Sequence, residues 1–439
     1  MINSYNIIDY GAVAGDKSAQ TAAIQKAIDD ADRNHGTVVI PSGIFVTGTL
    51  DIKGANICLC KGAVLLASPK REDYRNIGYL HCEFGETVSL LYSLGHSRIK
   101  LYGEGTIDLG GRYFFDFDTY NLPSEYKDNF KEAQKLEATA LCKWRPNQSI
   151  FFANCTDVSV EGVTILDAPC WTMTFSECER VRVESIVNIG HPRIPNNDGI
   201  HVTACRGVII HGCDIESADD CVAVSSITNW SRPCEDIIIS DCRFKSFSKA
   251  IVLGYSHSIV RNVTITNCQI RESNRGLCVM PAARTGYVGN VAVSNLYIDT
   301  RVRAGNWWGN GEPIFIYSLP HTTYDHIDFG DELSQRNFKV TAEDIVLSGI
   351  VCASENAAGV VGTDGNIRGV TLRDITIKRK PSDNIGIKGH TFDTSPAKPL
   401  GVEIADDVCL YVSGAEAVVE NLRGRGVDGE SARIVYAQA

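Results

Sequence analysis

The sequence predicts an all-β protein, a parallel β-helix of about ten coils with one capping helix near its N-terminus. Three observations lead to this fold class. A short β pattern recurs along most of the chain, a single amphipathic helical pattern precedes it, and the composition is globular, with 44% hydrophobic and 22% charged residues. At 439 residues the chain is longer than most single domains, but stacked repeats escape that limit because each unit packs only on its neighbours. We therefore predict one β-helix domain over residues 1–439.

The repeat is a short segment rich in Val and Ile at alternating positions, as in TDVSVEGVTI, RGVIIHGCDI and EDIIISDCRF. The first aliphatic residues of the segments are Val158, Val181, Val208, Ile237, Val263, Val291, Ile345 and Val370. Their intervals are 23, 27, 29, 26, 28, 54 and 25 residues, and we interpret the interval of 54 as two periods with one weak rung between. A β unit of this length cannot bury its own apolar face, so such units stack. Leucine-rich repeats have a similar period, but leucine at fixed positions and a helix in each repeat are both lacking.

Three regions depart from the repeat. Residues 1–66 are expected to form the N-terminal cap and the first coils. Within them, Thr21–Arg33 has the period of an amphipathic helix, with an apolar face made of Ala22, Ile24, Ala27, Ile28 and Ala31. The stretches 110–147 and 303–328 interrupt the repeat and are rich in aromatic residues. We expect both to be insertions that wall a cleft, because exposed aromatic rings suit sugar faces.

Charge and cysteine usage exclude several classes of partner. The net charge of −11 argues against a nucleic-acid partner, which usually needs a basic face. No apolar run is long enough to span a membrane, and no CxxC pair or Cys/His cluster has zinc spacing, so we expect no membrane, metal or cofactor. The N-terminus has no basic and apolar signal pattern, which favours a cytoplasmic protein with reduced thiols, or a secreted one whose signal was removed. Nothing in the sequence indicates an oligomeric state.

The stretch 195–225 carries the candidate chemistry. Asp198 lies in a turn-like Asn-Asn-Asp-Gly, and the pair Asp219 and Asp220 follows 21 residues later. If that segment forms one coil, the three carboxylates meet on neighbouring coils. Three close carboxylates cannot all ionise easily, so one keeps a proton and can act as an acid. Paired carboxylates on a rigid support are what hydrolysis of a glycosidic bond requires, which predicts an oligosaccharide substrate.

The segment CTDVSVEGVTILDAPCWTMTFSECERVRVESI is followed by PNNDGI and SADDCVAV. In these residues the chain resembles the polygalacturonase group, glycoside hydrolase family 28, within the pectate-lyase-like right-handed β-helix proteins. The resemblance implies an inverting hydrolase of a pectin-related or other cell-wall saccharide. It also implies that Asp219 is the general acid, and that Asp198 and Asp220 hold and deprotonate the attacking water.

The chain departs from the family where the family recognises galacturonate. The Gly-His-Gly of the next coil reads Ser248-Lys249-Ala250, and the Arg-Ile-Lys one coil later reads Cys278-Val279-Met280. The lysine often found after the Asp-Asp strand is Ser225. A uronate without a positive partner loses about 1.5–3 kcal/mol. We therefore expect the −1 sugar to be neutral or deoxy, or to be a uronate held differently, by Lys249 in a shifted pose or by the nearby Arg275 and Arg284.

Other candidate substrate contacts rest on weaker signals, and each has a purely structural alternative. They are Asn196, Trp171, His191, Arg193, Tyr255, Trp307, Trp308 and Glu312. We interpret His201 as structural.

Three functions remain open from the sequence. The first is hydrolysis of an oligosaccharide, by an exo-acting enzyme. The second is a uronate lyase or epimerase on the same fold, for which Lys249 offers a base. The third is a non-catalytic carbohydrate-binding β-helix, which the three aspartates speak against.

Overall fold

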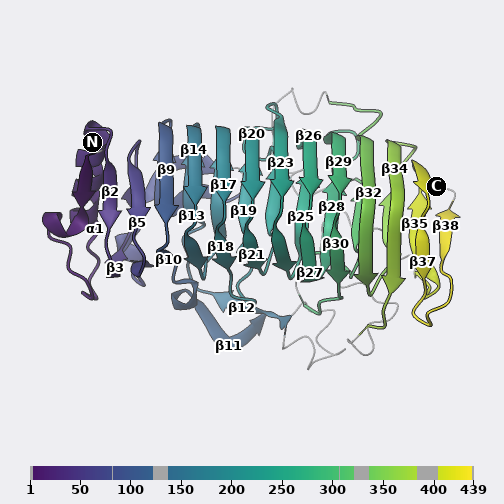
Figure 1. Ribbon diagram of the computed structural model, residues 1–439, viewed down its shortest axis with the longest axis horizontal. Helices are drawn as coiled ribbons and strands as arrows, with labels where there is room; N and C mark the ends of the chain where they lie inside the picture. The colour runs from purple at the N-terminus through teal and green to yellow at the C-terminus, as the bar shows by residue number, and fades with distance from the viewer. Residues whose placement is uncertain are drawn as a thin grey trace.

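The computed structural model describes residues 3–81, 83–121, 137–305, 307–320, 336–382 and 404–437. It is a right-handed parallel β-helix whose coils stack along one axis from the N-terminal to the C-terminal end (Figure 1). The described strands of its two large sheets pair in parallel, apart from one antiparallel pair near the N-terminal end. None of the described helices is long and apolar enough to cross a membrane.

The larger sheet has 23 strands. In chain order they are β1 (Ser4–Asn6), β2 (Thr37–Ile40), β3 (Gly43–Thr47), β5 (Asn56–Leu59), β6 (Ala63–Ala67), β9 (Ser97–Gly103), β10 (Thr106–Asp108), β14 (Thr156–Glu161), β15 (Thr164–Leu166), β17 (Glu179–Glu184), β18 (Val187–Ile189), β20 (Arg206–His211), β21 (Asp214–Ser217), β23 (Cys234–Ser240), β24 (Arg243–Ser246), β26 (Ile259–Thr266), β27 (Gln269–Ser273), β29 (Tyr287–Ser294), β30 (Tyr297–Thr300), β32 (Ala342–Ser354), β34 (Ile367–Arg379), β36 (Ala415–Glu420) and β37 (Arg423–Arg425).

The smaller sheet has 13 strands and carries the candidate site. They are β4 (Leu50–Asp51), β7 (Asn76–His81), β8 (Gly85–Leu94), β13 (Gln148–Ala153), β16 (Trp171–Ser176), β19 (Ile200–Thr203), β22 (Val222–Ser225), β25 (Lys249–Gly254), β28 (Arg275–Met280), β31 (Ile314–Tyr317), β33 (Ala358–Val361), β35 (Val408–Ser413) and β38 (Arg433–Ala437). Apart from β7, which pairs antiparallel with β8, each coil adds one strand, so the stack is somewhat longer than predicted. Three short 3-10 helices lie at Ile7–Tyr10, Arg71–Asp73 and Gly111–Tyr113.

The predicted capping helix is confirmed as α1 (Thr21–Arg33), which lies at the N-terminal end of the stack (Figure 1). Its buried residues are Ile24, Ala27, Ile28 and Ala31, and it packs against the first strands. Ala22, predicted on the same face, is exposed. The helix thereby covers apolar side chains of the first coil, which have no preceding coil to cover them.

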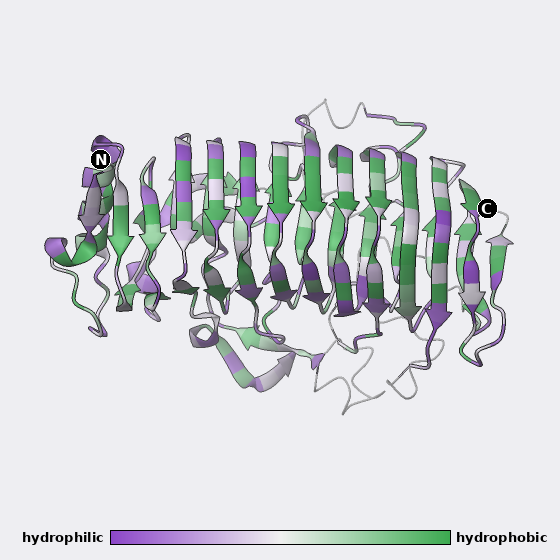
Figure 2. Ribbon diagram, in the orientation of Figure 1, coloured by the Kyte–Doolittle hydropathy of each residue, from purple (hydrophilic) through white to green (hydrophobic). Residues whose placement is uncertain are grey.

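The register of the larger sheet confirms the repeat residue by residue. Val158 pairs with Val181, Val181 with Val208, and the same ladder continues through the remaining predicted positions to Val370. Their side chains are buried in one continuous core, and the strands are correspondingly rich in hydrophobic residues (Figure 2).

The interval of 54 residues was interpreted wrongly. Val291 pairs directly with Ile345, so the interval is one coil, lengthened by an insertion, and not two periods. The predicted insertion 303–328 is likewise not all loop, since β31 within it joins the smaller sheet between β28 and β33. Residues 321–328 lie outside the described part of the chain. A spacing along the sequence cannot distinguish a long coil from a missing rung.

The two insertions lie next to each other. In the first, β11 (Phe115–Asn121) and β12 (Thr139–Cys142) form an antiparallel hairpin that projects from the stack (Figure 1), and residues 122–136 lie outside the description. Glu137, two residues before β12, accepts hydrogen bonds from Arg301 and Arg303, which lie where the second insertion begins. The indole Nε1 of Trp307 donates to the Glu137 carbonyl over 2.8 Å. The two insertions therefore brace each other.

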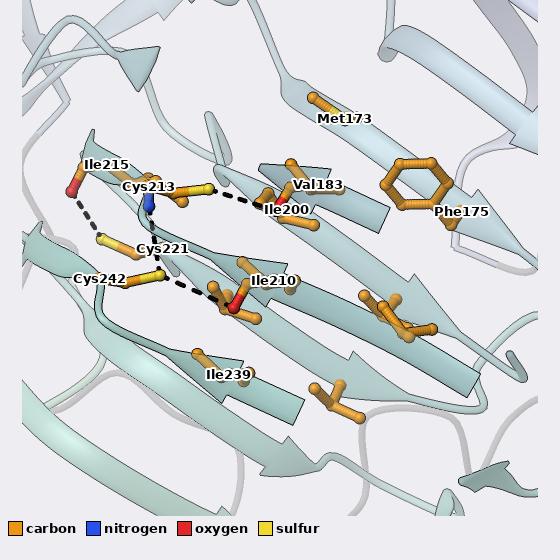
Figure 3. Close-up of a cluster of buried hydrophobic side chains, with 14 of the residues drawn as sticks. Met173, Phe175, Val183, Ile200, Ile210, Cys213, Ile215, Cys221, Ile239 and Cys242 are labelled. Carbon is orange, nitrogen blue, oxygen red and sulfur yellow. Dashed lines mark hydrogen bonds between the residues drawn. The ribbon is translucent and has the colours of Figure 1, made fainter. Parts of the chain in front are cut away.

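Cysteines form stacks at the turns of the coils. Asn154, Asp241 and Asn267 each take a left-handed backbone conformation, with φ of 54 to 57°, and each directly precedes a buried cysteine. Asn and Asp tolerate this conformation, which turns the chain and directs the next side chain into the core. Neighbouring cysteines then meet: the Cys213 amide donates to Cys242 Sγ over 3.4 Å (Figure 3). None of the fifteen described cysteines is in a disulfide, and twelve of them are buried.

We expect these buried thiols to resist chemical modification in the folded protein. Burial raises the pKa of Cys170, Cys221 and Cys234 to about 12, which leaves almost no thiolate at neutral pH, and thiolate is the reactive form. Access of the reagent matters as well: in a titration with a chromogenic thiol reagent, exposed Cys142 should react under native conditions, although partial burial raises its pKa, while the twelve buried cysteines should react only after denaturation. A Cys142→Ser variant should lose one rapid thiol. Rapid reaction of most thiols under native conditions would contradict this packing.

Candidate active site

The candidate residues occupy the starts of four consecutive strands of the smaller sheet. Asp198 precedes β19, the pair Asp219 and Asp220 precedes β22, Lys249 begins β25, and Arg275 begins β28. Backbone hydrogen bonds fix this alignment: the Gly199 amide donates to the Asp220 carbonyl over 2.8 Å, and the Cys221 amide to the Lys249 carbonyl over 3.2 Å. The coils therefore hold Asp198, Asp220, Lys249 and Arg275 in one row, as the sequence predicts for the aspartates.

The three carboxylates converge. One oxygen from each of Asp198, Asp219 and Asp220 lies within 4.8 Å of the others. Asp198 and Asp220 are buried, whereas Asp219 is only partly buried. Burial raises the pKa of both Asp198 and Asp220, and the charge of Asp219 adds to the rise. The cluster therefore holds a proton more readily than an exposed carboxylate does.

Asp198 is held by His201, which the sequence suggested was only structural. His201 Nε2 lies 2.7 Å from Asp198 Oδ2, and the imidazole stacks on Trp171 with ring centroids 3.5 Å apart. Burial lowers the pKa of His201 to about 3, so the ring is neutral at pH 7. The other oxygen, Asp198 Oδ1, is buried and has no hydrogen-bonding partner within the described residues. Trp171 therefore supports the site through His201.

Asp220 is held by Lys249. The Nζ atom lies 2.9 Å from Asp220 Oδ1, and the Lys249 amide donates to the same oxygen over 3.3 Å. Trp308 covers the ammonium, whose Nζ lies 4.1 Å from the ring centroid. Burial opposes the charge of Lys249, but Asp220 and Asp219 outweigh it and raise the pKa of the ammonium. The prediction that Lys249 contacts substrate is corrected, because its side chain is 2% exposed and faces Asp220.

Asp219 is held through its backbone, which leaves its side chain available. The Ser217 and Ser246 hydroxyls donate to the Asp219 carbonyl over 2.5 and 2.6 Å. The preceding Ala218 amide donates to the side-chain oxygen of Asn197 over 2.6 Å. Sequence reasoning missed Asn197, although its place beside Asp198 was a signal. These contacts fix the turn from which the most exposed of the three carboxylates projects.

Arg275 and Glu312 pair with each other and not with substrate. Arg275 Nε donates to Glu312 Oε2 over 3.1 Å, and Nη2 donates to Oε1 over 3.0 Å. The Arg275 side chain is 0% exposed and the Glu312 side chain 7% exposed. The guanidinium also lies 4.5 Å from the ring centroid of Phe315. The predicted substrate roles of both residues are therefore corrected to structural support of the coil next to Lys249.

Trp307 and Arg193 are likewise anchors for the insertions. Trp307 is 1% exposed and donates to the Glu137 carbonyl. The Arg193 guanidinium donates to the carbonyls of Ala138, Phe117 and Thr119 in the first insertion. Long-range contacts of this kind have no signature in the local sequence. The predicted substrate contact of Trp307 is corrected accordingly, whereas that of Arg193, which is only partly buried, stays a prediction.

The remaining candidates are exposed to different degrees. Tyr255 and Trp308 are partly buried, with ring centroids 5.5 Å apart, beside Lys249. Asn196 Oδ1 accepts from Arg145 Nη2 over 2.8 Å, and Arg145 is a residue that sequence reasoning missed. His191 packs on Phe117 of the hairpin with ring centroids 4.3 Å apart, and burial lowers its pKa. Arg284 is exposed in the loop between β28 and β29.

The positions of the family's cationic grip form an apolar cluster. Cys278 and Met280 are 0 and 1% exposed. They pack with Ala223, Val252, Phe315 and Tyr317, against partly buried Tyr255 and Trp308. No side chain of this cluster carries a charge. Two cations among the described residues border the cluster, Lys249 over Trp308 and Arg275 over Phe315, and each is already paired with a carboxylate.

The chain is similar to known proteins in sequence and in fold. A sequence profile described as glycosyl hydrolases family 28 matches residues 92–391. A probable polygalacturonase of Vitis vinifera is 24% identical over 321 residues, which cover 68% of this chain and 61% of the relative. The first three curated relatives are matched over 50 to 61% of their own length.

Solved structures share the fold. The family 28 exopolygalacturonase of Yersinia enterocolitica superposes with a TM-score of 0.65 at 16% identity, covering 100% of this chain and 78% of the other. The exopolygalacturonase of Thermotoga maritima superposes with a TM-score of 0.63 at 20% identity, covering 99 and 92%. Since the profile matches well over half of the chain, the chain belongs to the glycosyl hydrolases of family 28.

Proposed function

We propose that this protein hydrolyses a glycosidic bond of an oligosaccharide, with Asp219 as general acid and with Asp198 and Asp220 holding and deprotonating the attacking water. One observation carries the proposal: the two buried carboxylates each have a nitrogen partner, while the third projects from a turn held by its backbone. The two roles of hydrolysis, giving a proton and taking one, need carboxylates in different surroundings.

The chemistry follows from these surroundings. Asp219 gives its proton to the glycosidic oxygen as the bond from that oxygen to the anomeric carbon breaks. The water oxygen bonds to the same carbon, and its proton passes to Asp220 or Asp198. Asp198 Oδ1, without a partner among the described residues, is a ready acceptor for that water.

We propose inversion at the anomeric carbon, on the strength of family membership. Typical inverting enzymes hold their two carboxyl groups about 6.5–9.5 Å apart, whereas one oxygen from each of the three carboxylates here lies within 4.8 Å of the others. A water bound by two carboxylates beside the acid needs less room than one that must lie between an acid and a single base. Proton NMR of the first product formed should detect the inverted anomer.

We propose that the −1 sugar is neutral or deoxy. The apolar cluster around Cys278 and Met280 cannot bind a carboxylate, and Lys249 is already paired with Asp220. A uronate placed there would lose its hydration without gaining a charged partner. The two exopolygalacturonases of similar fold support release of sugars from a chain end, so we propose exo action.

The lyase alternative finds no support in the site. A lyase base must be neutral to take a proton, but the charge of Asp220 favours the protonated form of Lys249 and raises its pKa. A carbohydrate-binding protein without activity would have no use for three crowded carboxylates, two of them buried at a cost in stability.

A panel of oligosaccharides tests the proposed function. Matched substrates should end in a neutral, a 6-deoxy or a uronic sugar, and released reducing ends and ultraviolet absorbance should both be followed. We expect reducing ends from the neutral or deoxy series, at least about tenfold faster than from the uronic series, since a lost charge-assisted contact is worth 1.5–3 kcal/mol. Rising absorbance from an unsaturated product would indicate a lyase, and faster cleavage of the uronic series would overturn the sugar proposal.

A further inference from the structure

We propose that Lys249 is a positioning residue, whose ammonium orients the Asp220 carboxylate toward the attacking water and favours its charged form against the surrounding groups, and that Trp308 covers the ammonium and holds it in place. This inference rests on the proposed function. It assigns a role to the residue that stands in place of the family histidine, and to the insertion that covers it.

Two contacts from one residue fix the same oxygen. Lys249 approaches Asp220 Oδ1 with its ammonium at 2.9 Å and with its backbone amide at 3.3 Å. The ammonium and the amide together fix the orientation of the carboxylate, and the other oxygen, Oδ2, is the one that Lys249 leaves for a water. The pair is almost fully buried, with side chains 2 and 10% exposed, so bulk water does not weaken the attraction.

Trp308 links this pair to the acid through a chain of hydrogen bonds. Its ring lies over the ammonium at 4.1 Å, and its amide donates to Ser248 Oγ over 3.1 Å. The Ser248 amide donates to Ser246 Oγ over 2.8 Å, and that hydroxyl donates to the Asp219 carbonyl. Trp308 of the second insertion is therefore linked both to the turn that carries Asp219 and to the Lys249 ammonium that pairs with Asp220.

The charges around Asp220 explain why a cation is needed. Burial and the neighbouring aspartates all favour protonation of this carboxylate, and only Lys249 opposes them at ion-pair distance within the described residues. Among the described residues, the titratable and charged groups that act on the pair are Asp198, Asp219, His201 and Cys278, with Arg275 and its partner Glu312 on the next strand. Arg145 acts on Asp198. Arg275, one coil away, is neutralised by Glu312 and adds little net charge.

The pH profile of Lys249→Met tests the inference. Without the cation, the charged form of Asp220 loses its partner, so the base is protonated over a wider range. We expect the acidic limb of kcat/KM to move to higher pH by about one to three units, with little change in KM. Lys249→Arg keeps the positive charge, so its acidic limb of kcat/KM should lie close to that of the unchanged protein. Circular dichroism and thermal unfolding check that each variant folds.

A second measurement does not depend on turnover. In protein labelled with 13C at the aspartate carboxyl groups, one carboxyl resonance should titrate at higher pH in Lys249→Met than in the unchanged protein. Trp308→Leu, which keeps the ammonium but uncovers it, should shift the same resonance less and in the same direction. This variant serves if Lys249→Met fails to fold.

Unchanged pH profiles and unchanged carboxyl titrations in Lys249→Met would overturn the inference, as would a loss confined to KM, which would make Lys249 a substrate contact. Failure of the proposed function looks different. In that case the unchanged protein cleaves no oligosaccharide, while the carboxyl titration still reports on the pair.

Discussion

Asp219→Asn is expected to lower kcat by about 10²–10⁴-fold, the usual contribution of a general acid, with KM changed much less. Asparagine has the shape of the protonated carboxyl group but cannot give up a proton to the glycosidic oxygen. The fold should survive, because the turn is held by hydrogen bonds to the Asp219 carbonyl and not to its side chain. Thermal stability should change little, since asparagine has nearly the same volume as the protonated carboxyl group that it replaces. Initial rates on the best substrate of the panel, with a melting curve, measure both effects.

A matched control comes from the same chemical change elsewhere. Asp364 is exposed before β34 and has φ of 54°, a conformation that asparagine also tolerates. Asp364→Asn should leave kcat and the melting curve unchanged. An Asp219→Asn enzyme that kept most of its activity would remove this residue from the role of acid.

Glu312→Gln is expected to cause the largest loss of stability among the variants considered. It removes the charge that compensates the guanidinium of Arg275, which is wholly buried. Breaking a buried ion pair by losing one partner costs about 3–5 kcal/mol, because the remaining buried charge is no longer compensated by its partner. Denaturant unfolding should show this as a lower midpoint, and local loss of order beside Lys249 should reduce activity as well.

Two further variants separate the buried pair from ion pairs in general. Glu420 pairs with Arg373 at the surface, where both side chains are about half exposed, so Glu420→Gln should leave the midpoint almost unchanged. Arg275→Met combined with Glu312→Leu replaces both charges by apolar side chains and should recover most of the lost stability. An unchanged midpoint in Glu312→Gln alone would mean that the pair is more hydrated than its 0 and 7% exposure indicates.

The fold was predictable because each coil carries the repeat pattern within its own short stretch of sequence. Each coil must bury its own Val or Ile at a fixed place in the strand, so the ladder from Val158 to Val370 appears both in the sequence and in the register. The lengthened coil between Val291 and Ile345 could not be recognised, since an insertion leaves the flanking strands unchanged. The spacing of the repeat segments in the sequence shows where strands start, but not whether the residues between them form another coil or an insertion.

The positions of the site residues were predictable for the same reason, but the contacts of their side chains were not. The positions of Asp198, Asp219 and Asp220 follow from the start of each strand. A side chain at the start of a strand faces substrate only if no other side chain covers it. The residues that cover it are distant in the sequence: Glu312 is 37 residues from Arg275, and Trp307 contacts Glu137 across 170 residues. Arg275, Lys249 and Trp307 were therefore assigned to the substrate although other side chains bury them. His201 was underestimated because its bond to Asp198 depends on side-chain direction.

The row of Asp198, Asp220, Lys249 and Arg275 has a consequence for how such an enzyme can change over evolutionary time. Each coil contributes one member of the row, and the backbone hydrogen bonds between coils do not depend on which side chain stands there. A substitution in the row can therefore change the side chain on one coil while the backbone register of the neighbouring coils stays the same. The aspartates and the residues that hold them stand on separate coils, so they can change one position at a time.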